Sequence, residues 1–180
     1  MRTCSRLSLL VAASVSTVLG ISSQARAADS CQAVFDALVK VATIPSHSYS
    51  TSTATKRSKP SEAETIFADG HKYIRARGKW RRIPMTAQDA LKQEKEKEDH
   101  GKSTCQFLRN EPLNGEPSVL FYLHREYEQA GEKIIEDGQM WISKTTGLPL
   151  RVEEDWGNQG IPVNEHRLTR FEYGNVQPPM

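Results

Sequence analysis

The residues most often used for metal binding and catalysis are widely spaced in this chain. The five histidines are His47, His71, His100, His124 and His166. No two of them fall within five positions of each other, so the sequence lacks the local His-x-His and His-Glu-x-x-His pairs that bind zinc. It also lacks the nucleophile-elbow, phosphate-loop and dinucleotide-binding motifs. We predict no metal, no cofactor and no catalytic residue, with an enzyme built from dispersed residues as an open alternative.

The charged residues form two clusters. The acidic run at 153–155 does not make a ready acid–base pair, because adjacent residues of a strand point to opposite faces. The basic cluster comprises Lys72, Arg75, Arg77, Lys79, Arg81 and Arg82, and four of these share one parity. On one straight strand those four would share a face. That face is either a solvated surface or a contact for anionic headgroups or an acidic partner.

The amino terminus predicts export. Arg2 and Arg6 precede an uncharged, mostly apolar stretch at 7–21, and an Ala-x-Ala site ends at Ala27. This is the pattern of a secretory signal peptide, which we expect to be cleaved after Ala27. The apolar stretch is shorter than the roughly 20 residues that a membrane-spanning helix needs. We predict a signal peptide at 1–27, a single domain at 28–180, and a periplasmic location without an integral membrane segment.

The predicted cleavage removes the basic character of the chain. The full sequence has 24 Lys and Arg against 22 Asp and Glu, and three of the arginines lie in residues 1–27. The remaining balance is 21 against 22. Nucleic acid as a partner loses its support, because phosphate binding needs a surplus of cations.

Two cysteines remain after cleavage, since Cys4 leaves with the signal peptide. Cys31 and Cys105 are expected to pair in an oxidising compartment, and two unpaired buried thiols are the alternative. Cys31 lies on the apolar stripe of a helix that Asp29 or Ser30 could cap and that extends to Thr43. The pair would then fasten this helix to a strand that carries Cys105.

The rest of the chain reads mainly as strands. Residues 46–58 are rich in Ser and Thr and predict a polar strand near a sheet edge. Asp-Gly at 69–70 and Gly78 predict tight turns of hairpins. Thr86 and Asp89 predict the start of a charged helix at 87–98, which is either a connector or a movable flap. From Ser103 onward we expect antiparallel strands in series. Apolar and charged residues alternate at 148–156, which predicts a strand with one apolar and one charged face.

Large apolar side chains recur on the predicted strands. Most of them should belong to the core, but together they could line a concave sheet that encloses an apolar ligand. The predicted lining residues are Phe67, Tyr73, Trp80, Phe121, Trp141, Leu148 and Phe171.

The stretch MWISKTTGLPLRVEEDWG, with the helix-first exported layout and the charged helix, resembles the LolA/LolB-like superfamily of periplasmic lipoprotein carriers and receptors. The shared signature consists of Trp141, Ile142, Thr146, Gly147, Leu148 and Pro149. The resemblance implies an α+β fold in which a curved, unclosed antiparallel sheet (a half-barrel) wraps over one or more helices and encloses an apolar cavity for acyl chains. It also implies a functional buried arginine. The candidates for it, and for contact with a polar headgroup, are Arg75, Arg77 and Arg151.

The predicted function is therefore non-catalytic binding of a lipid, an acylated protein or another apolar ligand in the periplasm. The alternative is a secreted interaction or structural module whose own side chains fill the concave face. The protein partner and the oligomeric state do not follow from the sequence.

Overall fold

The computed structural model describes residues 23–55, 59–129, 131–158 and 161–179, and contains two helices and nine strands. The helices are α1 (Ser23–Thr43) and α2 (Ala87–His100). The strands are β1 (Ser46–Ala54), β2 (Ser61–Ala68), β3 (His71–Ala76), β4 (Lys79–Thr86), β5 (Lys102–Asn110), β6 (Ser118–Gln129), β7 (Glu132–Ser143), β8 (Pro149–Asn158) and β9 (Ile161–Tyr173). Residues 1–22 of the predicted signal peptide, and with them Cys4, lie outside the described residues.

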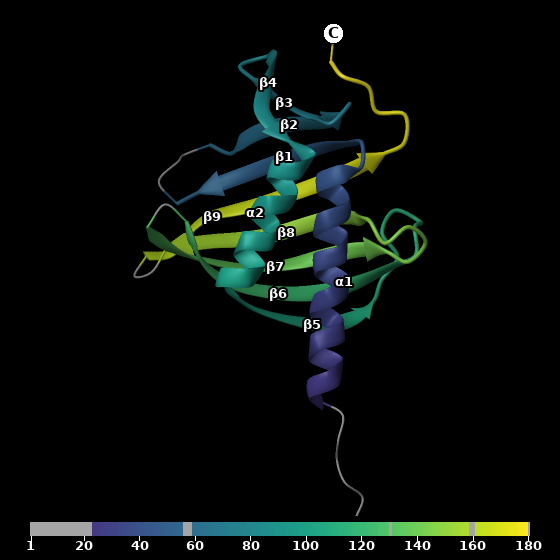
Figure 1. Cartoon of the computed structure of the whole chain (residues 1–180), viewed down its shortest axis with the longest axis vertical. Helices are drawn as coiled ribbons and strands as arrows, with labels where there is room; N and C mark the ends of the chain where they lie inside the picture. The colour runs from purple at the N-terminus through teal and green to yellow at the C-terminus, as the bar shows by residue number, and fades with distance from the viewer. Residues whose placement is uncertain (1–22, 56–58, 130, 159–160, 180) are drawn as a thin grey trace, which may run out of the picture.

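All nine strands form one antiparallel sheet in the order β4-β3-β2-β1-β9-β8-β7-β6-β5. The first four strands and the last five are each a meander, and β1 joins them by pairing with β9. The sheet does not close, because β4 and β5 lie at opposite edges. It curves around both helices, which lie next to each other on its inner, concave face (Figure 1). This is the open, curved α+β fold that the sequence predicted.

The predicted turns follow from residues that accept positive φ. The β2–β3 turn has Asp69 at φ 51° and Gly70 at 71°, and the β3–β4 turn has Arg77 at 52° and Gly78 at 75°. Two consecutive left-handed residues characterise the type I′ turn, whose twist matches that of a two-stranded hairpin. The predicted start of α2 is also confirmed. The side chain of Thr86 accepts a hydrogen bond from the backbone N of Asp89, and the Asp89 carboxylate accepts one from the backbone N of Thr86.

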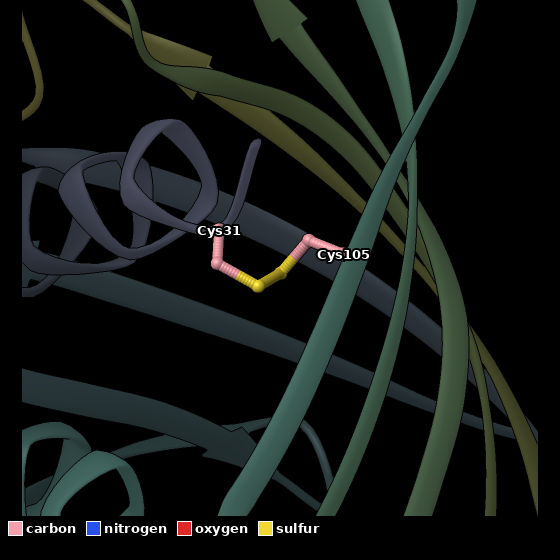
Figure 2. The surroundings of a disulfide bond; sticks show 2 residues. All are labelled: Cys31 and Cys105. Atoms are coloured by element: carbon pink, nitrogen blue, oxygen red, sulfur yellow. A yellow bond between two sulfur atoms is a disulfide. The ribbon is translucent and has the colours of Figure 1, made fainter. Parts of the chain in front are cut away.

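The predicted disulfide joins α1 to the edge of the sheet. Cys31 and Cys105 are bonded across 74 positions of sequence, and the bridge lies between the helix and β5 (Figure 2). It borders the core in which Val34 and Ala37 of α1, both fully buried, pack against β6 and β7. Lys40, near the end of α1, donates a hydrogen bond of 3.0 Å to the Thr146 carbonyl in the β7–β8 turn. The helix is thus fixed to the sheet at two places along its length.

Three local predictions were wrong. The polar strand at 46–58 is not near an edge: its described part, β1, is paired on both sides, because β9 returns from the far end of the chain to lie beside it. The first helix begins before the predicted caps Asp29 and Ser30, since α1 includes residues 23–28. Apart from these errors, the described residues contain no helix that is long and apolar enough to cross a membrane.

The third error concerns the four residues of the basic cluster that have the same parity. These residues, which are Arg75, Arg77, Lys79 and Arg81, do not share one face of the sheet. The turn at Arg77 and Gly78 reverses the chain, so Arg75 lies opposite Trp80 while Arg81 lies opposite Ile74. Residues that pair directly share a face of the sheet. Arg75 therefore lies on the outer face and Arg81 on the inner face, because parity is preserved only along a continuous strand.

Candidate ligand-binding pocket

A pocket of about 220 Å³ lies between the two helices and the inner face of the sheet. We call it the inner pocket. Its walls come from α1, α2, β1, β2, β3, β4 and β9, and its lining residues are Leu38, Val41, Ala42, Ser46, Ser48, Thr65, Phe67, Lys72, Met85, Thr86, Ala90, Gln93, Glu94 and Phe171. Segments far apart in sequence thus converge here, because the order of strands places β1, β2 and β9 side by side.

Much of the lining of the inner pocket is apolar. This part of the lining, which we call the apolar wall, consists of Leu38 and Val41 of α1, Phe67 of β2, Met85 at the end of β4 and Phe171 of β9. Phe67 is 8% exposed, so its ring is already removed from water without any ligand. Apolar walls with a few polar groups are typical of sites for small ligands.

The floor of the pocket exists because β1 carries small side chains. Ser46 lies opposite Phe67, Ser48 opposite Thr65 and Phe171, and Ser50 opposite Thr169. Ser50 and Thr169 join their hydroxyl groups at 2.9 Å. These serines all point to the inner face, since alternate residues of a strand share a face. A serine side chain leaves space between sheet and helix that a leucine or phenylalanine would fill.

A polar wall adjoins the apolar one. Lys72 of β3 lies opposite Phe67 and therefore points to the inner face. Burial, together with the positive charges of Arg167 and Lys97, lowers the pKa of Lys72 below its ordinary value. Glu94 of α2 lines the same pocket but is already paired with Lys97 at 3.1 Å and with Arg125 at 3.1 Å. Burial alone would raise the pKa of Glu94, but the charges of Lys97 and Arg125 outweigh burial and lower it.

Behind Glu94 lies a buried ionic network that the sequence did not suggest. Arg125 of β6 binds Glu94 of α2 and Glu136 of β7, and Tyr127 donates a hydrogen bond to Glu136. The side chains of Arg125 and Glu136 are only 8% and 3% exposed. Lys97 of α2 also lies over the Tyr127 ring, 5.1 Å from its centroid. This network attaches α2 to the sheet through ion pairs. Apolar burial contributes less here, because none of the residues described for α2 is buried.

The structure therefore replaces the sequence-based candidates for a buried arginine. Arg125 is the buried arginine of the described chain, whereas Arg75 is 46% exposed and pairs with Glu64 at 2.8 Å. Arg77 is exposed in the β3–β4 turn. Arg151 is 31% exposed on the outer face, where it lies over the Trp141 ring and binds Glu153. The sequence signal for Arg125 was its position on a strand where the neighbouring odd residues are Phe121, Leu123 and Tyr127.

The predicted lining residues divide between the two faces of the sheet. Phe67 and Phe171 line the inner pocket. Phe121 is also on the inner face, but it packs in the core with α1 rather than around the pocket. Leu148 is buried in the β7–β8 turn.

The remaining three predicted lining residues, Tyr73, Trp80 and Trp141, lie on the outer face. The register shows this, because Tyr73 pairs with Arg82, Trp80 with Arg75, and Trp141 with Arg151. Alternation along a strand identified the two faces in β8 but did not tell which face of each strand meets the helices. The ligand-binding role of all seven residues remains a prediction, and two of them, Phe67 and Phe171, line the inner pocket.

The fold and pocket define an α+β protein in which an open nine-stranded antiparallel sheet covers two helices and leaves an apolar hollow between them. The sequence matches no protein-family model, and no curated protein is significantly similar to it.

Among solved structures, the fold is similar to that of MucB in its complex with MucA(peri), with a TM-score of 0.47 and 14% identity over 83% of this chain and 57% of the MucB chain. It is also similar to LprF from Mycobacterium bovis, with a TM-score of 0.42 and 10% identity over 86% of this chain and 96% of LprF. A DUF1329 family protein from Desulfovibrio piger has a TM-score of 0.28 and 13% identity over 83% of this chain and 95% of its own. These proteins are too distant to indicate what this chain binds.

Proposed function

We propose that this protein is a non-catalytic, periplasmic binding protein that holds one aliphatic chain in the inner pocket. The observation that carries the proposal is the apolar wall formed by Leu38, Val41, Phe67, Met85 and Phe171 around a hollow with a serine floor. The aliphatic chain would belong to a lipid, to an acylated protein or to another apolar ligand. The predicted signal peptide supports the periplasmic location.

The volume of the pocket limits the ligand to a short length of one chain. A cavity of about 150 Å³ accommodates benzene, so 220 Å³ gives room for roughly nine carbon atoms. Each methylene transferred from water to an apolar site contributes about 0.8 kcal/mol. A segment of this length can therefore be held without any reactive group. Two acyl chains side by side would require the helices to move apart.

The alternative is an interaction or structural module in which the concave face needs no ligand. It is favoured by the small size of the pocket, which lies below the roughly 300–1,000 Å³ of most small-molecule sites. It is also favoured by the packing of α1 onto β5, β6, β7 and β8, which fills the other half of the inner face. The two functions differ in whether the remaining hollow takes up an aliphatic chain.

The test replaces a small side chain in the floor of the inner pocket with a larger one. Ser48→Leu adds a branched side chain that points into the inner pocket, and Thr51→Leu adds the same group on the outer face of the same strand as a matched control. Binding of 1-decanol is measured by the NMR signal of the Met85 methyl group, which lies in the pocket wall. Thermal unfolding of each variant checks that the fold is kept.

We expect 1-decanol to shift the Met85 signal saturably in the wild type and in Thr51→Leu, and to leave it unchanged in Ser48→Leu. Absence of a shift in the folded wild-type protein would rule out the chain-binding function and favour the self-filled module. An equal shift in folded Ser48→Leu would show that decanol binds elsewhere.

A further inference from the structure

Lys72 is the one pocket-lining cation, and it has no counter-ion among the described residues. It makes neither an ion pair nor a hydrogen bond there, although it is half-buried on the inner face beside Phe67. A lysine is seldom removed from water without a partner, because burial of an unpaired charge is costly. The position of this unpaired ammonium group therefore indicates which kind of ligand group the pocket could hold.

The carboxylate that lines the pocket with Lys72, and others on the inner face of the sheet, are engaged by other cations. Glu94 is shared by Lys97 and Arg125, and Glu136 is bound by Arg125. Arg167 binds Glu165 at 2.8 Å and approaches Glu154 at 4.0 Å. Lys72 also feels the positive charges of Arg167 and Lys97, which makes its end of the pocket electropositive. An acceptor for the Lys72 ammonium group must therefore come from outside this network.

The end of β4 contributes to the apolar wall and pairs irregularly with β3 beside Lys72. The register with β3 shifts between His71, which pairs with Thr86, and Lys72, which pairs with Ile83. The extra residues on β4 are Pro84 and Met85. Proline cannot donate a ladder hydrogen bond, so it is tolerated on an edge strand and at an irregularity of this kind. Bulges of this kind re-aim side chains beside functional sites. Here the irregular segment supplies Met85 to the lining of the pocket, which Lys72 also lines.

We propose that the inner pocket selects a single-chain amphiphile with an anionic oxygen headgroup, a carboxylate or a phosphate monoester, which accepts hydrogen bonds from Lys72 while the chain lies against Phe67, Phe171 and Met85. This specificity rests on the proposed function, since it assigns a headgroup to the chain bound there. The hydroxyl groups of Ser48 and Thr65 line the same hollow and can donate further hydrogen bonds to the headgroup. Charge-assisted hydrogen bonds of this type are among the stronger ones in proteins.

The experiment compares three ten-carbon ligands on the intact chain. Decanoate and decyl phosphate carry the anionic headgroup, and 1-decanol has the same chain with a neutral headgroup. Affinities are measured by titration calorimetry for the wild type, for Lys72→Gln, and for the matched control Lys92→Gln. Lys92 is an exposed lysine of α2, 75% exposed at its side chain, and it lies outside the pocket.

We expect at least one anionic ligand to bind the wild type about tenfold or more tightly than 1-decanol, as is typical for a hydrogen bond to a charged group. Lys72→Gln should remove that preference while leaving 1-decanol binding within about twofold, and Lys92→Gln should change neither. The glutamine removes an unpaired charge from a half-buried site, so the variant should fold. Its thermal unfolding is checked before titration.

Two negative results can be told apart. Equal binding of all three ligands, or an anion preference that survives in Lys72→Gln, would overturn the headgroup assignment while leaving the chain-binding function intact. Failure of all three ligands to bind would overturn the proposed function itself, and the headgroup assignment with it.

Discussion

The buried ionic network makes a quantitative prediction about stability. Arg125→Met removes the cation that binds Glu136, whose side chain is 3% exposed, and keeps the apolar length of the arginine stem. Breaking a buried pair by removing one partner typically costs about 3–5 kcal/mol, because the other charge remains buried without compensation. We expect a loss in the unfolding free energy within that range. The loss of the Arg125–Glu94 pair adds little to this cost, because Glu94 still pairs with Lys97 at 3.1 Å.

The double variant Arg125→Met/Glu136→Gln should recover most of this loss. The glutamine carbonyl still accepts the hydrogen bond of Tyr127, which Glu136 accepts in the wild type, and no charge is left buried at this position. Replacement of both members of a buried pair is often close to neutral. The two substitutions should therefore be strongly coupled, by about 2 kcal/mol or more, as is found for residues in one network.

The measurement is urea unfolding at pH 7, followed by tryptophan fluorescence with the disulfide intact. Arg109→Met is the control, because Arg109 pairs with Glu111 at 2.7 Å but is 59% exposed. Exposed pairs contribute about 0–1 kcal/mol, so this variant should stay close to wild type. The reasoning would be refuted if Arg125→Met also stayed within about 1 kcal/mol, or if the double variant were as unstable as the sum of the single ones.

Two further predictions concern covalent and titratable links. Cys31→Ala/Cys105→Ala opens a loop of 74 positions and should lower the unfolding free energy by about 4 kcal/mol in urea unfolding, and a change below about 1 kcal/mol would show that the bridge adds little to the fold. His124 binds Asp137 at 2.8 Å, and this hydrogen bond raises the pKa of His124. The resulting stabilisation is present below the unfolded pKa and is lost as the pH rises through the folded one. Asp137→Asn should lower the His124 pKa in an NMR titration, and also the pKa of Tyr122, which the hydrogen bond to Asp137 raises to about 12; unchanged values would contradict the assignment.

The features that the sequence predicted correctly are those with a local cause. The turns at Asp69–Gly70 and Gly78 depend on residues that tolerate positive φ, and the start of α2 depends on the capping pair Thr86 and Asp89. The two faces of β8 follow from alternation: Arg151 and Glu153 point outward, and Val152 packs against the core. Each depends on a few neighbouring residues, which the sequence shows directly.

The features that it missed depend on pairing between distant segments. The position of β1 in the middle of the sheet is set by its contact with β9, more than 100 residues later. Lys72 and Arg125 differ from other charged residues of the sheet because β3 and β6 curve around the same helices, which places both side chains on the inner face. Their type and spacing look like those of any charged residue on a sheet. The inner face of β7, β8 and β9 mixes Met140 and Val152 with Glu136, Glu154 and Arg167, so polarity alone does not identify the inside.

The serines of β1 connect the fold to the proposed function. They lie at 46, 48, 50 and 52 in the segment that the sequence predicted to be a polar strand near an edge, yet their face of the strand is turned toward the helices. The half of the sheet built from β5 to β8 is covered by α1 and packed with residues such as Phe121 and Met140. A centrally placed strand with such small inner side chains cannot fill the other half. The hollow therefore lies over the strand whose inner residues are smallest, and filling that strand with a single leucine at Ser48 should abolish the pocket without disturbing the sheet.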